Sequence, residues 1–426
     1  MPCKNPSWLS RGRWRQPAFN FNRVLFVVVA AALLSVACAS ITSCAHKHKK
    51  QTAAPRPLLE RLEPQDIPAL SDIKGDEASL KKSIKEALTA LSRQDQKQAV
   101  AFGNKTIDMR RIKETLQTFL QLLDEDLTPR AFHDKLVKEF DFYRVNARRG
   151  NGTEDPPMLI TGYFQPELPA SLSPDSHFNY PVYAVPNDLV GVNLKTFDPN
   201  LPNMTIWGRV SANRLIPYYT RREIDSGEGP KNTPVLAWID SPIDGLMLHI
   251  QGSGILKFQN GGRRFIHYAA SNGLPYKSVG AWLIEHGFLG KDQADWGHIR
   301  AWADKNPERL KDALASNPRY IFFEWEDEGP LGSLGETLIP FRSVALDPTF
   351  YPPGAVCLVK FDMPAGIGHD TTGPFEAFVC NQDAGAAIKG PYRLDLYCGE
   401  GDKAGKIAGT LKAPGWFYLM LVKESK

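Results

Sequence analysis

The sequence predicts a mainly β protein with a helical region near its N-terminus, and two patterns in the 426-residue chain lead to this fold class. Apolar residues recur at intervals of three and four between Glu77 and Phe140, as on one face of a helix. From Met158 onward, short β-branched and aromatic runs alternate with Gly, Pro and Asn, which is typical of strands joined by turns. The first 44 residues differ from both regions and have the composition of an export signal.

Three helices are expected between residues 76 and 161. The first two are indicated by apolar residues spaced for one buried face. The third is expected to begin at Thr128-Pro129, because a threonine cap followed by proline is a common start of a helix. The apolar positions are Leu80, Ile84, Leu88 and Leu91, then Ile112, Leu116, Phe119, Leu120 and Leu123, and finally Leu136, Val137 and Phe140.

The rest of the chain is expected to be β-rich. A helix is predicted over Ser278–His286, a polar helix within 293–315, and strand character resumes at Tyr320. The runs predicted to be strands before these helices are MLITGYF, YPVYAV, PVLAWI, LMLHIQGSGIL and RRFIHYA.

The N-terminal segment has the three parts of a secretory signal. Five Lys or Arg and no Asp or Glu accompany the apolar run Val24–Ala37, and small residues follow it. A retained membrane span is the alternative, but this run is shorter than the roughly 20 residues that a span needs. Ile41-Thr42-Ser43-Cys44 resembles a bacterial lipobox, which predicts lipidation of Cys44, with Cys38 as the alternative. Acyl chains there would tether the body to a membrane through a flexible linker, residues 45–75.

The composition points away from nucleic acid, metals and cofactors. Of the 51 Lys and Arg, five lie in the leader, which leaves 46 against 47 Asp and Glu, and no basic stripe appears. No Cys or His cluster has the spacing of a metal site, so neither a metal nor a cofactor is expected. Cys357, Cys380 and Cys398 follow the linker; in an oxidising compartment two of them could pair, and the sequence does not say which.

Three aspartates near the C-terminus are the candidates for chemistry. Asp347, Asp383 and Asp395 each lie in or beside a short apolar segment close to glycine. Two carboxyl groups in one cleft shift each other's pKa values, and a desolvated one can stay protonated near neutrality, as a general acid requires. Aspartates beside glycine or proline also commonly cap turns, and the spacing alone favours that alternative.

These segments resemble the membrane-bound lytic murein transglycosylase A family, whose fragments read like DPxxIPxG, DxGGAIKG and DxYxGxG. The resemblance covers roughly residues 110–425 in consistent order, with Ala386 in place of one glycine. The fragments that carry it are Thr161–Phe164, Gln251–Gly254, Tyr268–Gly273, Asn317–Phe323, Asp347–Gly354, Asp383–Gly390 and Leu394–Gly401.

The resemblance implies a double-psi β-barrel with an inserted second β-rich domain, and a glycan lying between the two. The implied organisation is a signal peptide over residues 1–44, the linker 45–75, a helical region 76–161 packing on the barrel, a glycan-binding insert 162–326, and a barrel 327–426 with the catalytic aspartate.

The resemblance also implies a non-hydrolytic lytic transglycosylase of cell-wall turnover, which cleaves the MurNAc-GlcNAc β-1,4 bond and leaves a 1,6-anhydromuramoyl end. Asp395 matches the family's catalytic aspartate and would be both acid and base, with Asp383 in support and Asp347 structural. The implied partners are peptidoglycan strands and a membrane, reached by a lipid anchor on the periplasmic side, as in an outer-membrane lipoprotein. The expected substrate-binding residues are Thr161, Gly162, Tyr163, Gln251, Gly252, Ser253, Tyr268, Asn272, Gly385 and Lys389.

Two other functions stay open at this point. A hydrolase could use Asp383 and Asp395 with water and would leave a reducing end. A non-catalytic glycan-binding lipoprotein would bind sacculi and release no fragments.

Overall fold

The structure is a computed structural model that describes residues 57–68, 77–146, 158–364, 373–385 and 387–424. The leader, with Cys38 and Cys44, and most of the expected linker lie outside these residues. Residues 55–426 form one compact unit, and all contacts given below are within it. No helix in the described part of the chain has both the length and the apolar character needed to cross a membrane.

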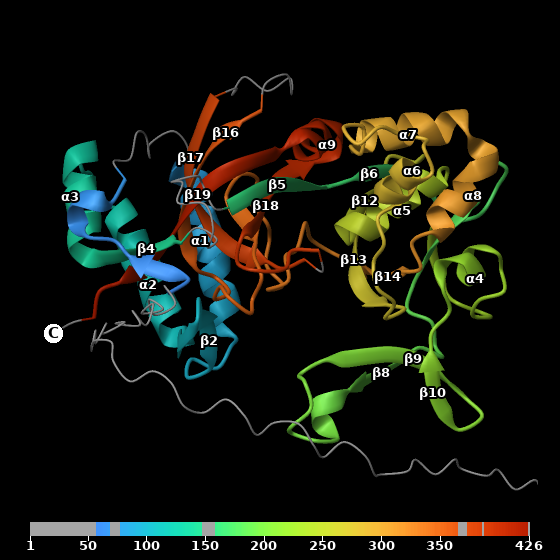
Figure 1. Cartoon of the computed structure of the whole chain (residues 1–426), viewed down its shortest axis with the longest axis horizontal. Helices are drawn as coiled ribbons and strands as arrows, with labels where there is room; N and C mark the ends of the chain where they lie inside the picture. Colours follow the sequence, from blue (N-terminus) through green and yellow to red (C-terminus); the bar gives the residue numbers. More distant parts are fainter. Residues whose placement is uncertain (1–56, 69–76, 147–157, 365–372, 386, 425–426) are drawn as a thin grey trace, which may run out of the picture. The chain divides into compact units, whose positions relative to one another are not determined.

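Six strands close into a barrel (Figure 1). Their order around the ring is β5, β18, β15, β17, β16 and β19, and β19 pairs back with β5. The β18–β5 and β15–β17 pairings are parallel and the other four are antiparallel. This barrel confirms the predicted mainly β fold. The strands are β5 (Met158–Gln165), β15 (Ser343–Ala345), β16 (Val356–Met363), β17 (Gly373–Asp383), β18 (Arg393–Glu400) and β19 (Lys412–Val422), and β4 (Phe140–Val145) and β1 (Leu59–Arg61) extend the sheet from β19.

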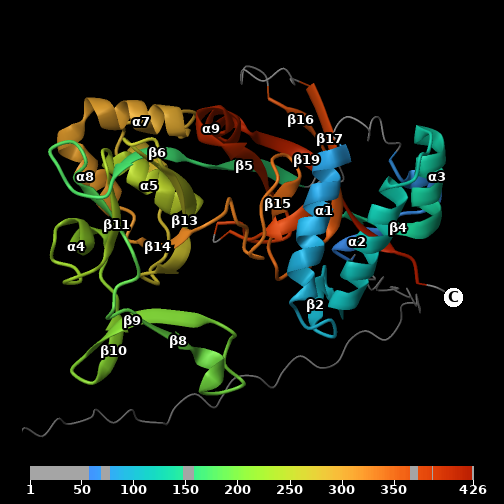
Figure 2. The same cartoon turned by 180° about the vertical axis from the view of Figure 1, so that it is seen from behind.

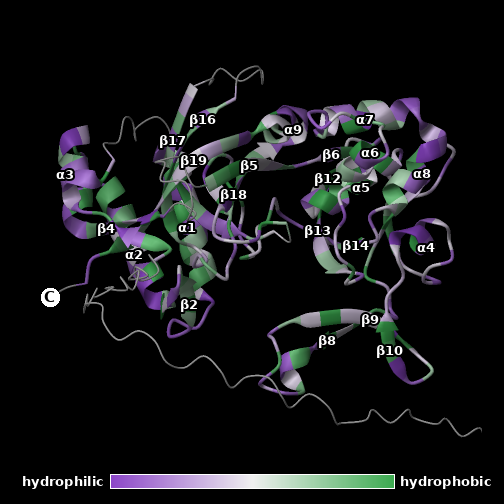
Figure 3. Cartoon of the chain, in the orientation of Figure 1, coloured by the Kyte–Doolittle hydropathy of each residue, from purple (hydrophilic) through white to green (hydrophobic). Residues whose placement is uncertain are grey.

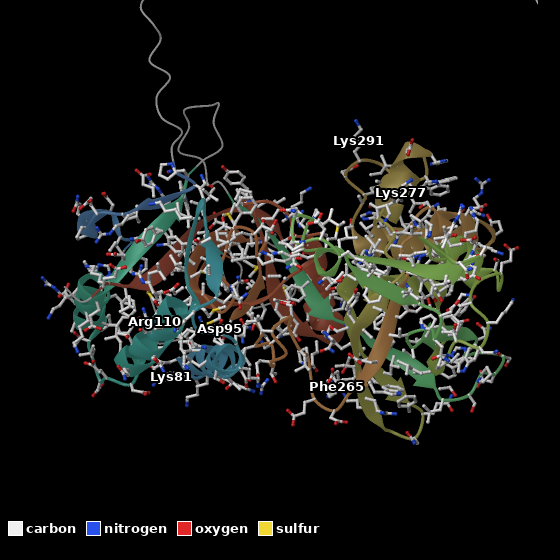
Figure 4. All side chains as sticks on the ribbon, turned by 90° about the horizontal axis from the view of Figure 1, so that it is seen from below. Lys81, Asp95, Arg110, Phe265, Lys277 and Lys291 are labelled. Carbon is white, nitrogen blue, oxygen red and sulfur yellow. The ribbon has the colours of Figure 1, made fainter. Side chains whose placement is uncertain are left out.

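Three N-terminal helices form where the periodicity predicts them: α1 (Glu77–Ser92), α2 (Met109–Leu123) and α3 (Pro129–Glu139). The Thr128 side chain accepts a hydrogen bond from the Ala131 amide and caps α3, as predicted. Helix α1 packs on β17 and α2 packs on β19, seen from behind in Figure 2. The side chains of Lys81 and Arg110 lie at the surface of these two helices (Figure 4). A short hairpin of β2 (Ala99–Phe102) and β3 (Lys105–Asp108) joins α1 to α2.

Helix α1 is also joined to the barrel by a buried polar contact. The hydroxyls of Ser83 and Ser343 both donate to Oε1 of Gln382, at 2.7 and 2.6 Å. Gln382 directly precedes Asp383, so α1 contributes to the position of that aspartate.

Between β5 and β15 the chain forms a second β-rich region with its own core. Its main sheet has the order β14-β13-β12-β6-β11-β7, and a three-stranded sheet has the order β10-β9-β8. The strands are β6 (Glu167–Ser171), β7 (Tyr180–Tyr183), β8 (Val190–Asn193), β9 (Thr205–Ser211), β10 (Arg214–Pro217), β11 (Val235–Ile239), β12 (Ser253–Phe258), β13 (Arg263–Ser271) and β14 (Ile321–Glu326); the helices are α4 (Arg221–Asp225), α5 (Pro242–Gln251), α6 (Val279–Glu285), α7 (Trp296–Lys305) and α8 (Pro307–Ala315), and α9 (Gly401–Thr410) lies between β18 and β19.

Two predictions about local structure are wrong. The LMLHIQ part of a predicted strand is the end of helix α5, because Ser241 caps its start, Pro242 occupies its first position and Gly252, at φ 80°, ends it. The single polar helix predicted within 293–315 is two helices. Pro307 cannot continue α7 and instead begins α8.

Strand β5 crosses the expected boundary between residues 161 and 162. Its register pairs it with β18 and β19, so it belongs to the barrel along its whole length. We therefore propose that the insert runs from β6 to β14.

Candidate active site

Asp395 lies in the middle of β18, between β5 and β15. Its register partners are Thr161 on β5 and Ala345 on β15. The Thr161 hydroxyl donates to Oδ1 of Asp395 and in turn accepts from the Arg393 guanidinium at 3.3 Å. Burial raises the pKa of the Asp395 carboxyl above its usual range, and the charge of Asp383 raises it further, against the Thr161 hydrogen bond and the charge of Arg393. The half-buried Asp395 is therefore suited to hold a proton.

Asp383 is the last residue of β17 and is paired with Ala345 from the other side of β15. Its Oδ1 accepts from the backbone amides of Ser333 at 2.9 Å and Ala384 at 2.8 Å. Burial raises the pKa of the Asp383 carboxyl, while these amides and the nearby His267 oppose that rise. The fold thus places Asp383 and Asp395 opposite the same residue of β15.

Two tyrosines lie beside these carboxyl groups on the β5–β18 pair. Tyr163 and Tyr397 are register partners with ring centroids 5.3 Å apart. Their position two residues after Thr161 and Asp395 places all four side chains on one face. Burial and the charge of Asp383 raise the pKa of Tyr163. The Tyr163 hydroxyl interacts with the Asp383 carboxyl and lowers the pKa of that aspartate, whereas the buried Tyr397 hydroxyl has no hydrogen-bond partner among the described residues and is free to bind a polar ligand.

Asp347 does not join the other two aspartates. It is buried, and it accepts from the Gly390 amide at 2.7 Å and from the amide and hydroxyl of Thr349 at 3.0 and 2.8 Å. These bonds lower the pKa of Asp347 despite its burial. Asp347 therefore ties the end of the 383–390 segment to the barrel. Lys389 and Gly385 are in that segment, and the Lys389 side chain is exposed.

Three expected substrate-binding residues have structural contacts within the protein. Asn272 is fully buried; its amide donates to the carbonyls of Tyr219 and Pro318 and accepts from the Tyr320 amide, so we withdraw it as a glycan contact. Gly162 is in close contact with α9, as a Cβ there would lie 2.8 Å from Ala408 Cα. Gln251 Oε1 accepts from the amide of Phe164 at 3.2 Å, which connects the end of α5 to the barrel strand β5.

The remaining expected residues are spread over the insert. Gly252 has the left-handed conformation that ends α5, and Ser253 begins β12 opposite His267. Tyr268 on β13 is 36% exposed and is accessible to a ligand.

The sequence does not single out His267 and Tyr397 as site residues. His267 lies close enough to Asp383 to affect its pKa, and its buried Nδ1 has no partner within the described part of the chain. Both residues are in predicted strand segments, so their faces depend on a register that the sequence leaves open.

The three cysteines outside the leader are buried free thiols, including Cys380 and Cys398. No disulfide therefore joins any two of these three cysteines in this structure.

Comparisons with known proteins identify both parts of the chain. A family profile described as "MltA specific insert domain" matches residues 159–324, and one described as "3D domain" matches residues 342–421. The chain is 30% identical over 282 residues to a protein of Vibrio cholerae named membrane-bound lytic murein transglycosylase A, covering 66% of this chain and 69% of the relative.

Solved structures share the fold. The crystal structure of a membrane-bound lytic murein transglycosylase from Agrobacterium tumefaciens matches with a TM-score of 0.71 at 24% identity, over 85% of this chain and 97% of that one. MltA from Neisseria gonorrhoeae matches with a TM-score of 0.68 at 26% identity, over 86% and 93% of the two chains. The chain belongs to the membrane-bound lytic murein transglycosylase A family.

Proposed function

We infer that this chain is a lytic transglycosylase that cleaves the glycan strands of peptidoglycan. The observation that carries the inference is Asp395, a half-buried carboxyl group with a raised pKa on the barrel strand β18, opposite Thr161 and Ala345. It lies in a chain whose relative is named for this activity. A carboxyl group that keeps its proton near neutrality can act as a general acid on a glycosidic oxygen.

We propose that Asp395 serves as acid and then as base. As acid, it protonates the oxygen that joins N-acetylmuramic acid to N-acetylglucosamine, and the bond from that oxygen to C1 of the muramoyl residue breaks. As base, the resulting carboxylate takes the proton of the muramoyl C6 hydroxyl, whose oxygen bonds to C1. The products are a free C4 hydroxyl and a 1,6-anhydro ring. No water is consumed, and Asp395 ends as it began.

The neighbours of Asp395 support this double role. The Thr161 hydroxyl engages Oδ1, which leaves the other carboxyl oxygen to carry the transferred proton. Ionised Asp383 raises the pKa of Asp395 and so favours its acid form. The buried Tyr397 hydroxyl, without a partner among the described residues, would bind a sugar hydroxyl or acetamido group.

The products of digestion test this function. We would incubate residues 45–426, which include the compact unit, with purified sacculi and analyse the soluble fragments by mass spectrometry. A 1,6-anhydromuramoyl end, lighter than a reducing end by one water, is expected. Reducing ends would instead identify a hydrolase that uses Asp383 and Asp395. Binding without any fragments would identify a glycan-binding protein.

We further propose that the protein is lipidated at Cys44, or at Cys38, and that it works at the periplasmic face of the envelope. Support comes from the lipobox-like ITSC sequence and the basic and apolar leader before it. Mass spectrometry of the N-terminal peptide from the membrane fraction tests this. An acylated cysteine is expected, and a serine substitution at the acylated position should release the protein from the membrane.

A further inference from the structure

The small sheet of β8, β9 and β10 has one face made only of apolar side chains. Residues that are directly opposite in antiparallel strands share a face. Val192 is opposite Ile206, Val210 is opposite Leu215, and Val190 and Pro217 are opposite the same glycine of β9. We call these six residues the apolar face.

The apolar face is not covered by the described parts of the chain. Val210 is 63% exposed, and Ile206 and Leu215 are 37% and 38% exposed. None of the six residues belongs to the hydrophobic clusters that the described residues form. Phe197, in the segment between β8 and β9, is 76% exposed and adds to the apolar surface. Figure 3 shows hydrophobic residues on the strands of this sheet.

The opposite face of the same sheet packs on the protein at its centre, through Trp207 and Arg209, while Thr205 and Ser211 at its ends are exposed. Trp207 belongs to a hydrophobic cluster and lies against Gly273, where a Cβ would come within 2.9 Å of its side chain. The Arg209 guanidinium lies over the Tyr219 ring, 4.3 Å from its centroid. An antiparallel sheet with one solvated face normally turns its polar side outward. This sheet also turns an entirely apolar face outward, which indicates that the apolar face has a partner.

The chemistry of the apolar face fits a lipid bilayer. Its six side chains offer no hydrogen bond and include no Tyr, Trp or Arg, whereas protein interfaces carry regular hydrogen bonds and favour those residues. Membrane-surface segments need only apolar side chains with cations nearby. Lys195, exposed and three residues after Val192, supplies such a cation.

The expected anchor would bring a bilayer within reach. Twelve residues separate Cys44 from Pro57, where the described chain begins. A fully extended segment of that length spans at most about 45 Å, so a lipidated protein would be held close to the membrane.

We propose that the apolar face of the β8–β9–β10 sheet rests on a phospholipid bilayer, with its side chains at the boundary of headgroups and acyl chains. Insertion is shallow, because the outer edges of β8 and β10 carry unpaired backbone groups that hydrocarbon would not tolerate. The proposal uses the proposed lipid anchor only for proximity, and the face binds lipid without it.

The test is vesicle flotation with residues 45–426, which carry no leader and no lipid. Vesicles of phosphatidylethanolamine with about one quarter phosphatidylglycerol supply neutral and anionic headgroups. The wild-type protein is expected to float with them. Ile206→Asp/Val210→Asp should lower the partition coefficient by about tenfold or more, since two charges replace apolar contacts. The matched control, Thr205→Asp/Ser211→Asp, introduces the same charges on the same strand but on the other face, and should float like the wild type.

Three results would overturn the proposal: a wild-type protein that stays with the soluble fraction, an equal loss of flotation in both double variants, or a dimer in light scattering that Ile206→Asp/Val210→Asp converts to a monomer without vesicle binding. The last result would assign the face to a second copy of the chain. Thermal unfolding and digestion of sacculi in solution verify that each variant is folded. Acylation of Cys44 is measured separately, so failure of the anchor leaves the flotation result intact.

Discussion

Asp383 and Asp395 lie opposite the same residue, Ala345, from the two sides of strand β15. Strands in a sheet are about 4.8 Å apart, so the Cα atoms of the two aspartates are roughly 10 Å apart. At that separation in a half-buried site each charge affects the protonation of the other, and ionised Asp383 raises the pKa of Asp395. Strand β15, the shortest of the barrel, therefore separates the two carboxyl groups by a distance at which the charge of one still affects the pKa of the other.

Asp395→Asn should lower the rate of release of anhydromuropeptides by a factor of roughly 10² to 10⁴, the usual contribution of a positioned acid and base. Stability should not fall. Because burial raises the pKa of Asp395 in the folded state, its contribution to stability is complete below its unfolded pKa and is lost as the pH rises through its folded pKa. Urea unfolding at neutral pH should therefore show a variant as stable as the wild type, or more stable.

The control for this variant is Asp402→Asn, which removes an exposed carboxyl group near the start of α9. Its activity should match that of the wild type. A fall of only two-fold in Asp395→Asn would contradict the acid and base role.

Thr161→Val and Asp383→Asn should shift the pH dependence of activity in opposite directions. The first step needs protonated Asp395, so kcat/KM should fall as the pH rises through its pKa. The Thr161 hydroxyl lowers this pKa, and its removal should move the fall in activity to higher pH. The charge of Asp383 raises the pKa, and its removal should move the fall to lower pH.

The measurement is a pH profile of kcat/KM on soluble glycan fragments for the wild type and both variants. Shifts in the same direction would show that the two residues do not act through the charge state of Asp395. An unchanged profile in both variants would assign the titration to another group.

The helices have local signals in the sequence, whereas the barrel and the pair of carboxyl groups were predicted from the resemblance to a known family. Periodic apolar residues mark α1 and α2, and the ordered family fragments around Asp383 and Asp395, more than their glycines, single out these aspartates. The LMLHIQ end of helix α5 resembles a strand because most of its residues are apolar, so no helical spacing of apolar and polar residues is visible. Ser241 and Gly252 are nevertheless residues typical of the start and the end of a helix.

The roles of Asn272 and His267 depend on tertiary contacts and could not be predicted from local sequence patterns. Asn272 is polar and follows a strand, so its position is compatible with binding a ligand and equally with forming buried structural hydrogen bonds. Only the carbonyls of Tyr219 and Pro318, distant in sequence, decide between these roles. His267 is near Asp383 through pairing of strands that no local pattern specifies.

Asp347→Ala should destabilise the protein by about 2–3 kcal/mol, because three hydrogen bonds to a buried carboxylate are lost. The pKa of Asp347 is lowered in the folded state, so its stabilising effect is present above its unfolded pKa and is lost as the pH falls through its folded pKa. Urea unfolding of wild type and variant should therefore differ at pH 7 and converge in acid. An equal difference at both pH values would mean that packing, and not the charge, is responsible.

Gly162→Ala should destabilise the protein by about 1–3 kcal/mol, the usual cost of overpacking a core. The added Cβ would lie 2.8 Å from Ala408 Cα and 2.9 Å from Cys398 Sγ, so β5 or α9 must move. Gly409→Ala is the matched control, since it adds the same methyl group to α9 at a position with no atom within 4 Å. Alanine has the higher helix propensity, so that variant should be neutral or more stable by up to about 1 kcal/mol. Urea unfolding would distinguish the two variants. Equal midpoints would mean that β5 and α9 move apart without a loss of stability.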